Sequence, residues 1–362
     1  MTFPTPSYSR EQVKRAGIYL VENEDIPDID DNELLVKWFE AHRVLTNWRA
    51  CHSYPINTFQ STLRQKLRAI DGVALVAQRL KRTPSIIKKL KRFPSMSLSR
   101  MQDIGGLRAV VSSLSQLKDL YANYKATRFT HALVSEHDYV ANPKSSGYRS
   151  VHLVYKYKLR VPSPYEGLQV ELQFRTKLQH AWATAVETVG TFLEHSLKSS
   201  EGPDEWLNFF SLVSSAFAHT EGTTRVPGYE HMDKAETYQR TASEAARLGV
   251  NDLLRGYSSV VKAIPTGATR SAYYLVELQL SGDDRSVNIT PFARDKLEEA
   301  NIKYSEAEQR SSPSSPMQVV LVSAGSIESL KRAYPNYFLD THEFLSQLEK
   351  ITKSKLALLG QT

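Results

Sequence analysis

The segment LQVELQFRT, residues 168–176, alternates between apolar and polar side chains along its whole length. Successive side chains of a β-strand point to opposite faces, so this pattern predicts a strand with one buried face. The segments IGGLRAVVSS (104–113) and SVHLVYKYKL (150–159) are also rich in residues that favour strands. The middle of the chain is therefore expected to form a sheet, which the flanking segments must cover.

The segments on either side of these strands have helical spacing instead. Apolar residues recur at helical intervals between positions 31 and 90, and again in 179–195 and 204–219. A stretch of turn-forming residues follows at 221–231, and short helical and β-like segments come after it. We therefore expect an α+β fold, with a mixed, mostly five-stranded sheet flanked by helices in residues 1–225 and a smaller α/β module in residues 226–362.

The composition narrows the class of protein. The chain has 362 residues, 41% of them apolar and 23% charged, which is typical of a globular protein of about two domains. No run approaches the roughly 18 apolar residues of a membrane helix, and the N-terminal residues lack the apolar core of a secretory signal. The single cysteine, Cys51, excludes an internal disulfide and a thiolate zinc site. The sequence predicts a cytoplasmic protein with no membrane partner.

Positive charge is concentrated in one segment. The formal net charge is +7, yet no acidic residue lies between Asp71 and Asp103. Eight basic residues lie there: Arg79, Lys81, Arg82, Lys88, Lys89, Lys91, Arg92 and Arg100. Such a patch favours a polyphosphate or nucleic-acid partner, although a solvated helix face would have the same composition.

Two carboxylates are candidates for a Mg²⁺ site. Glu171 falls on the polar face of the alternating strand with Gln173 and Arg175, and Asp103 lies just ahead of another predicted strand. Mg²⁺ prefers a few carboxylates together with water and phosphate oxygens, so two carboxylates that converge from neighbouring strand ends would suit it. An ordinary solvent-facing sheet would show the same alternation, so this convergence is an expectation.

A turn-rich loop, NPKSSGYRSVH at 142–152, ends near Tyr148. A tyrosine at this position either packs in the core or offers a flat platform on which a nucleobase can stack. The neighbouring Lys144 and Arg149 favour the nucleotide interpretation.

Four blocks, in this order, resemble the synthetase domain of the RelA/SpoT-type pyrophosphokinase family. They are RLKRTPSIIKKLKR (79–92), MQDIGGLRAVV (101–111), HDYVANPKSSGYRSVH (137–152) and VELQFRTKLQHAWA (170–183). The resemblance implies an enzyme that moves the β,γ-pyrophosphate of ATP to the 3′-hydroxyl of a nucleotide, releases AMP and uses Mg²⁺. The dipeptide His137-Asp138 is similar to a metal site of hydrolase domains in larger members, but it lies inside the synthetase block and is interpreted as structural or acceptor-side.

The resemblance also implies roles for individual residues. Asp103 would bind Mg²⁺, and Glu171 would bind the metal or take the proton from the attacking hydroxyl. The residues expected to bind ATP are Arg79, which would stack on adenine, with Lys81, Lys88 and Arg108. Those expected to bind the acceptor are Tyr148, which would stack on its base, with Lys144, His152, Arg175 and His180.

The C-terminal appendage most resembles the CapRel-like, fused toxin–antitoxin members of the toxic small alarmone synthetase branch. This implies a tRNA acceptor end as substrate, inhibition of translation, and restraint by a C-terminal domain that is similar to a zinc-binding domain without zinc. A phage protein would release the restraint, and Tyr334 and Tyr337 would make the restraining contact with Arg79.

The sequence leaves three alternatives for the acceptor and the function open. Basic residues outside the predicted ATP site favour tRNA, among them Arg64, Lys66, Arg68, Lys125 and Arg128. A guanosine nucleotide, GDP or GTP, is the alternative acceptor, because a tyrosine platform serves both substrates equally well. A catalytically silent RNA-binding module is the third hypothesis, although the retained pair of Asp103 and Glu171 argues against it.

Overall fold

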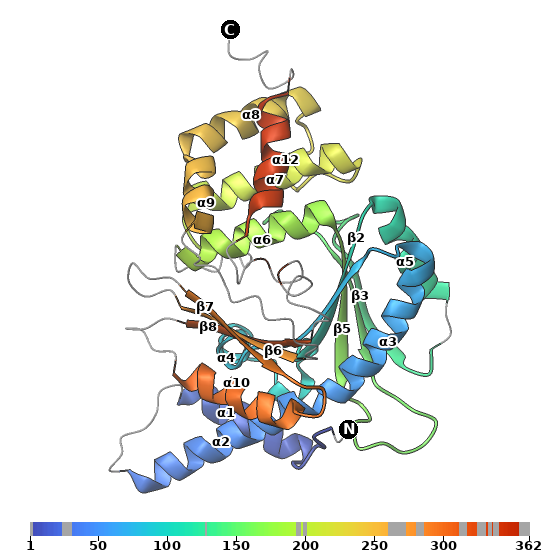
Figure 1. Cartoon of the computed structure of the whole chain (residues 1–362), viewed down its shortest axis with the longest axis vertical. Coiled ribbons are helices and arrows are strands. Elements are labelled where there is room, and N and C mark those ends of the chain that lie inside the picture. Colours follow the sequence, from blue (N-terminus) through green and yellow to red (C-terminus); the bar gives the residue numbers. More distant parts are fainter. Residues whose placement is uncertain are drawn as a thin grey trace.

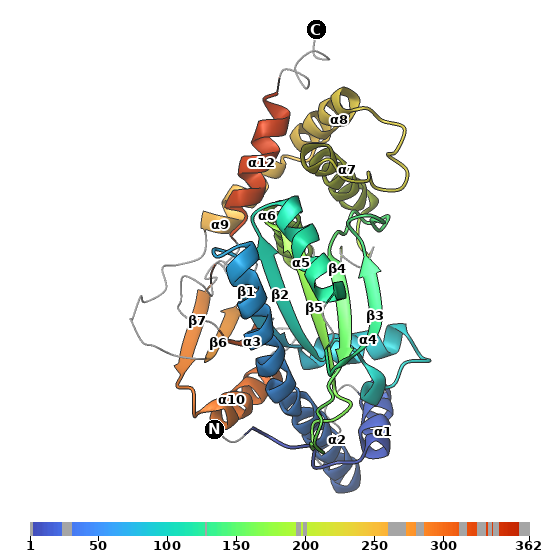
Figure 2. The same cartoon turned by 90° about the vertical axis from the view of Figure 1, so that its right-hand side faces the viewer.

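One mixed β-sheet runs through the computed structural model of this chain, and helices pack against it (Figures 1 and 2). The structure describes residues 3–23, 31–126, 129–192, 197, 201–259, 273–279, 286–310, 317–323, 331, 335 and 340–354. Within these residues the strands form a single eight-stranded sheet in the order β3-β4-β5-β2-β1-β8-β6-β7. The expected α+β class is confirmed.

The first five strands of the chain lie side by side, and three strands of the C-terminal module continue the same sheet. The expectation of helical structure throughout positions 31–90 is wrong at residues 75–80, which form a strand because they pair with a strand on each side in the sheet. The strands are β1 (Leu75–Leu80), β2 (Gly105–Val111), β3 (Ala132–Asp138), β4 (Val151–Lys156), β5 (Gln169–Thr176), β6 (Tyr273–Gln279), β7 (Ser286–Phe292) and β8 (Met317–Ser323). Strands β2 and β5 pair in parallel, and all the other neighbouring pairs are antiparallel.

The helices come mainly before and after the central strands. Those of the N-terminal half are α1 (Arg10–Glu22), α2 (Asn32–Cys51), α3 (Ser53–Ile70), α4 (Thr83–Arg92), the 3₁₀ turn η1 (Leu98–Arg100) and α5 (Leu114–Ala126). Those that follow are α6 (Lys177–Phe192), α7 (Asp204–Glu221), α8 (Lys234–Arg247), α9 (Val250–Ser259), α10 (Leu297–Gln309) and α12 (His342–Thr352). No helix in the described part of the chain is long and apolar enough to cross a membrane.

The largest core lies between the central strands and helices α3 and α5. Alternate residues of β2 and β5, such as Leu107 and Leu172, are buried there against Phe59 and Leu63 of α3. Because strand side chains alternate in direction, the residues between these apolar positions must point to the other face of the sheet. That other face carries the candidate site.

Gly105 lets α3 approach the sheet closely. A Cβ atom at this position would lie 2.7 Å from Cδ1 of Ile56, a residue of α3, whereas a Cβ at Gly106 would meet only the backbone oxygen of Glu171, at 3.8 Å. The two glycines of the expected strand start therefore differ. Gly105 is needed for packing, and Gly106 leaves open space beside Glu171.

A second core joins helices from both sides of the predicted domain boundary. Trp182 of α6 and Phe210 of α7 belong to the same buried cluster as Tyr238 of α8 and Phe344 of α12. Residue 226 lies between α7 and α8, so the proposed boundary passes through a region where the two predicted domains share a core. The boundary at 225/226 stays a prediction.

The C-terminal module also joins the rest of the chain through its strands. Strand β8 pairs with β1 at two positions, Gln78 with Ser323 and Arg79 with Val322. Figure 1 shows β6, β7 and β8 above α10. The module therefore contacts the strand that carries Arg79.

Candidate active site

The register of four strands assembles the polar face of the sheet. Gly106 of β2 lies opposite Arg79 of β1 on one side and opposite Glu171 of β5 on the other. Arg108 pairs in the same way with Ala77 and with Gln173. On the far side of β5, His152 of β4 lies opposite Gln173. Residues that are paired directly across strands share a face, so these side chains form one surface.

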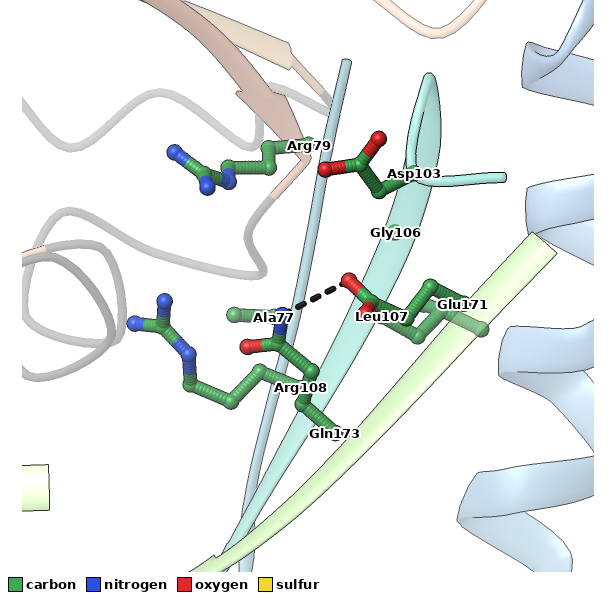
Figure 3. Close-up of a pocket in the computed structure, with 8 residues that line it drawn as sticks. All are labelled: Ala77, Arg79, Asp103, Gly106, Leu107, Arg108, Glu171 and Gln173. Carbon is green, nitrogen blue, oxygen red and sulfur yellow. Dashed lines mark hydrogen bonds between the residues drawn. The ribbon is translucent and has the colours of Figure 1, made fainter. Parts of the chain in front are cut away.

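An open pocket lies on this surface (Figure 3). Its lining residues are Ala77, Arg79, Asp103, Gly106, Leu107, Arg108, Glu171 and Gln173. In Figure 3 the guanidinium groups of Arg79 and Arg108 extend to the same side of the strands, and the carboxylates of Asp103 and Glu171 lie along the pocket. Asp103 and Glu171 therefore line one pocket, and their joint role in binding Mg²⁺ stays a prediction.

Asp103 is held by two lysines. Its Oδ2 atom lies 2.9 Å from Nζ of Lys81 and 2.9 Å from Nζ of Lys89. Burial by itself raises the pKa of Asp103, but the two ammonium groups outweigh burial and lower the pKa to about 2. Asp103 is therefore ionised at neutral pH.

Glu171 receives a donor on each of its oxygens. Nδ1 of His152 lies 2.8 Å from Oε1, and Nε2 of Gln173 donates to Oε2 at 2.7 Å, the dashed bond of Figure 3. Burial raises the pKa of Glu171, while the hydrogen bond and charge of His152 lower it more, so the net direction is down. The pKa of His152 is lowered by burial but raised more strongly by Tyr148 and Glu171. Glu171 is thus kept ionised at the side of the pocket.

The donor set suits Mg²⁺ better than a metal held by protein ligands alone. No group of three or more His, Cys, Asp or Glu side chains suited to a metal occurs within the residues that the structure describes. Oδ1 of Asp103 is buried and has no hydrogen-bond partner in that part of the chain. An unpartnered carboxylate oxygen beside a second carboxylate fits an ion that takes one or two protein carboxylates and completes its shell with water and phosphate oxygens.

Of the residues expected to bind ATP, three lie at the pocket or beside it. Arg79 and Arg108 line it, and Lys81 contacts Asp103. Lys88 lies elsewhere: its Nζ is 3.1 Å from Glu201, which also pairs with Arg92. Lys89, which the sequence analysis did not assign to the site, contacts Asp103 instead. The assignment of these residues to ATP stays a prediction.

The residues expected to bind the acceptor lie beside Glu171, in β4, β5, the loop before β4 and α6, and three of the five are buried. Tyr148, Arg175 and His180 are 8%, 2% and 8% exposed, and Tyr148 and His180 belong to the loop before β4 and to α6. The exposed Lys144 places its ammonium 4.6 Å from the ring centroid of Tyr139 and 5.6 Å from that of Tyr148. None of the five expected acceptor residues lines the pocket of Figure 3. Stacking of a base on Tyr148 stays a prediction that its present burial does not favour.

The remaining sequence expectations concern Asp138 and the two C-terminal tyrosines. Asp138 accepts hydrogen bonds from the backbone amides of Val140 and Ala141, both at 2.9 Å, so it closes a turn, in line with its structural interpretation. The proposed restraining residues Tyr334 and Tyr337 lie outside the residues that the structure describes.

Comparison with known proteins agrees with this geometry. Residues 78–191 match a family model described as the region found in RelA / SpoT proteins. The chain carries a RelA/SpoT region. All eight residues that line the pocket lie within or directly beside this RelA/SpoT region.

Curated relatives match about a third of the chain. GTP pyrophosphokinase YjbM of Bacillus subtilis is 35% identical over 127 residues, which are 34% of this chain and 56% of that protein. A GTP pyrophosphokinase of Escherichia coli K12 is 32% identical over 140 residues, which are 38% of this chain and 17% of that protein. The chain thus spans about half the length of the first relative and a small part of the second.

Solved structures are similar over about half of the chain. Small alarmone synthetase 1 of Bacillus subtilis, bound to its product pppGpp, is 25% identical, and the match covers 50% of this chain and 92% of that one with a TM-score of 0.41. The same synthetase bound to AMPCPP is 24% identical, with coverage of 50% and 92% and a TM-score of 0.36.

Proposed function

We propose that this protein is an ATP-dependent pyrophosphokinase, a diphosphotransferase that moves the β,γ-pyrophosphate of ATP to the 3′-hydroxyl of a guanosine nucleotide. The observation that carries the proposal is the pocket in the RelA/SpoT region, where Asp103 and Glu171 lie beside Arg79 and Arg108. The names of the curated relatives, GTP pyrophosphokinases, support GDP or GTP as the acceptor.

The residues of the pocket suit this chemistry. Phosphoryl transfer depends on positioning and on stabilising charge, and Arg79, Arg108, Lys81 and Lys89 supply positive charge around the carboxylates. The acceptor O3′ forms a bond to the β-phosphorus of ATP, the bond from that phosphorus to the α,β-bridging oxygen breaks, and AMP leaves. Glu171, which is ionised, takes the proton of the hydroxyl.

Asp103 and Glu171 are the residues that would hold Mg²⁺, which when bound would neutralise charge on the phosphate groups. Oδ1 of Asp103 is the oxygen left for it, because Oδ2 is occupied by Lys81 and Lys89. The two lysines hold the carboxylate of Asp103 through Oδ2, so Oδ1 is available to the metal ion.

A tRNA acceptor is the alternative that the sequence interpretation put first. Its physical support came from Arg64, Lys66 and Arg68 of α3, from Lys125 of α5, and from Arg128, which lies outside the residues that the structure describes. Two of the four described residues are engaged in contacts of their own. Nζ of Lys66 donates to Asn123 at 2.5 Å, and Nζ of Lys125 lies 2.8 Å from Glu136. None of the basic residues that were named for tRNA and that the structure describes lines the pocket of Figure 3, so we favour the guanosine nucleotide.

We further propose that the C-terminal module, residues 226–362, restrains the activity of the RelA/SpoT region. In the toxin–antitoxin hypothesis, a phage protein that binds the module would release this restraint. Support comes from two contacts: β8 pairs with β1 at Arg79, and Glu308 of α10 pairs with Arg49 of α2 at 2.9 Å. A module attached in this way can alter the position of Arg79 when a partner protein binds it.

One experiment tests the activity and the acceptor together. The purified full-length protein is incubated with Mg²⁺ and ATP labelled on its γ-phosphate, in parallel with GDP, GTP or deacylated tRNA. We expect AMP release and label on the guanosine nucleotide, both lost in Asp103→Asn and in Glu171→Gln. Label on the RNA alone would replace the acceptor with tRNA. RNA binding without any AMP release would instead establish the non-catalytic alternative.

A further inference from the structure

Three helices meet at one buried pair of charges. The side chains of Arg49 in α2 and Glu308 in α10 are 3% and 7% exposed, and Nη1 of Arg49 lies 2.9 Å from Oε2 of Glu308. Both side chains also contact Thr83, the first residue of α4. Nη1 of Arg49 donates to Oγ1 of Thr83 at 2.7 Å, and the backbone amide of Thr83 donates to Oε1 of Glu308 at 3.0 Å. The first residue of α4 is therefore fixed through both its side chain and its backbone.

Helix α4 depends on this junction at its N-terminus. The helix has only ten residues, and isolated helices of that length are marginal in water. Its N-cap residue, Arg82, makes no side-chain capping bond, and its second residue, Pro84, has no backbone N–H to donate. Glu308 thus supplies from another part of the chain the acceptor that the local sequence lacks.

Apolar packing alone does not set the position of α4 along its own axis. Ile86, Ile87 and Leu90 form the buried side of the helix and belong to the largest core. The hydrophobic effect that holds them there is non-directional. The two hydrogen bonds at Thr83 have defined distances and directions. The junction with Arg49 and Glu308 therefore specifies where the helix begins.

The segment around Thr83 carries both lysines that contact Asp103. Lys81 lies two residues before Thr83 and Lys89 lies six residues after it, and each Nζ atom is 2.9 Å from Oδ2 of Asp103. The backbone amide of Lys81 donates to the carbonyl oxygen of Ile104 at 2.8 Å, so the place of Lys81 beside Asp103 is fixed locally. Lys89 lies within α4, so its position follows from where the helix begins and how it is rotated.

We propose that Glu308 is a positioning residue for ATP binding, because by fixing Thr83 it sets α4 where Lys89 reaches Asp103; this rests on the proposed function. A buried ion pair generally stabilises a fold no more than apolar side chains of similar size. The pair of Arg49 and Glu308 therefore acts chiefly on the position of α4. Helix α10 then helps to assemble the pocket, in addition to the restraint proposed for the module to which it belongs.

The first test compares two full-length double variants that both remove the buried charge pair and differ in one acceptor atom. Arg49→Met/Glu308→Gln keeps a side-chain oxygen that can accept from Thr83, and Arg49→Met/Glu308→Leu does not. The control is Glu306→Gln, which changes an exposed carboxylate of α10 that pairs with Lys303. We expect KM for ATP to rise about fivefold or more in Arg49→Met/Glu308→Leu and to stay within about twofold in the other two variants. KM for the acceptor should be unchanged in all three.

A purely structural role of Glu308 would give a different result. A variant that is partly unfolded has fewer active molecules, so kcat falls while KM for each substrate stays at the wild-type value. An unchanged KM for ATP in Arg49→Met/Glu308→Leu would therefore overturn the proposal. Adding Lys89→Ala to this double variant should lower kcat/KM for ATP by less than Lys89→Ala does in the wild type, because both changes act on the same contact. Additive losses would show that Glu308 does not act through Lys89.

The second test does not depend on activity, so it separates this proposal from the proposed function. Hydrogen exchange of the backbone amides of α4 is measured without nucleotide in the wild type and in the two double variants. We expect exchange in α4 to become about fivefold faster or more in Arg49→Met/Glu308→Leu, because an uncapped first turn frays, with α5 unchanged. Exchange of α4 at the wild-type rate would overturn the proposal whatever the kinetics show. Absence of transfer by the wild type would overturn the proposed function, and faster exchange would still show that Glu308 sets this helix.

Discussion

Glu308, in helix α10 of the C-terminal module, accepts a hydrogen bond at 3.0 Å from the backbone amide of Thr83, the first residue of α4. The residue before α4, Arg82, makes no side-chain capping bond, so a carboxylate 225 positions away in the sequence supplies the cap. A negative charge there also suits the positive end of a helix dipole. The same carboxylate pairs with Arg49, whose guanidinium lies 4.7 Å from the ring centroid of Tyr304.

Glu308→Gln should destabilise the whole chain. The substituted side chain can still accept from Thr83, but it leaves the charge of Arg49 buried and unpaired, which costs about 3–5 kcal/mol. We expect the free energy of unfolding in urea to fall by about that amount. The double variant Arg49→Met/Glu308→Leu should recover most of the loss, because it removes both charges. A double variant less stable than Glu308→Gln would contradict this account.

The stability that Asp103 provides should depend on pH. Its pKa is lowered from 3.8 to about 2 in the folded state, so its contribution is present above pH 4 and is lost as the pH falls from about 4 to about 2. The size is about 2–3 kcal/mol, at about 1.4 kcal/mol for each unit by which the pKa is lowered. Urea denaturation of the wild type and of Asp103→Asn should show a difference that shrinks across this window. A difference that stayed constant from pH 6 to pH 2 would refute the assignment.

The paired glycines at the start of β2 should respond differently to the same substitution. Gly105→Ala places a methyl group against Ile56, so we expect a loss of about 1–3 kcal/mol in the free energy of unfolding. Gly106→Ala meets only one backbone oxygen at 3.8 Å and should change stability by less than about 0.5 kcal/mol. The added methyl group of Gly106→Ala would lie in the pocket, so this variant should raise KM for ATP and leave stability nearly unchanged. Equal stability of the two variants would argue against close packing at Gly105.

Two adjacent lysines of α4 form a second matched pair. Lys89 contacts Asp103 at the pocket, whereas Lys88 contacts Glu201 on the surface. Lys89→Ala should lower kcat/KM for ATP at least about tenfold, because it removes a positive charge beside the phosphates. Lys88→Ala should change the same ratio less than about twofold. Steady-state kinetics at saturating acceptor would measure both, and the reverse order would restore the original assignment of Lys88.

The local patterns of the sequence predicted β2, β4, β5 and the polar face of β5 correctly, because alternation is a short-range property. They placed β1 in a helical stretch and did not indicate β3. The phase of α4 was harder to predict. Ile86, Ile87 and Leu90 form its buried side, and Lys88 and Lys89 both lie next to them in sequence. Only the packed structure shows which lysine turns toward Asp103.

Long-range contacts could not be predicted from the patterns at all. The pairing of Gly106 with Glu171 joins parallel strands that are 65 positions apart, and a shift by one residue would have put Glu171 in the core. Glu308 lies in a helix with several exposed acidic residues, and nothing local distinguishes it from them. Its burial against Arg49 depends on how the C-terminal module docks.

The pairing of β8 with β1 has a consequence for any chain that loses its C-terminal module. Strand β1 would become an exposed sheet edge, and the backbone groups of Gln78 and Arg79 that now face Ser323 and Val322 would be left without strand partners. Open edges recruit strands from other molecules. A shortened chain would therefore be prone to self-association through the strand that carries Arg79, and its oligomeric state would have to be known before its activity is interpreted.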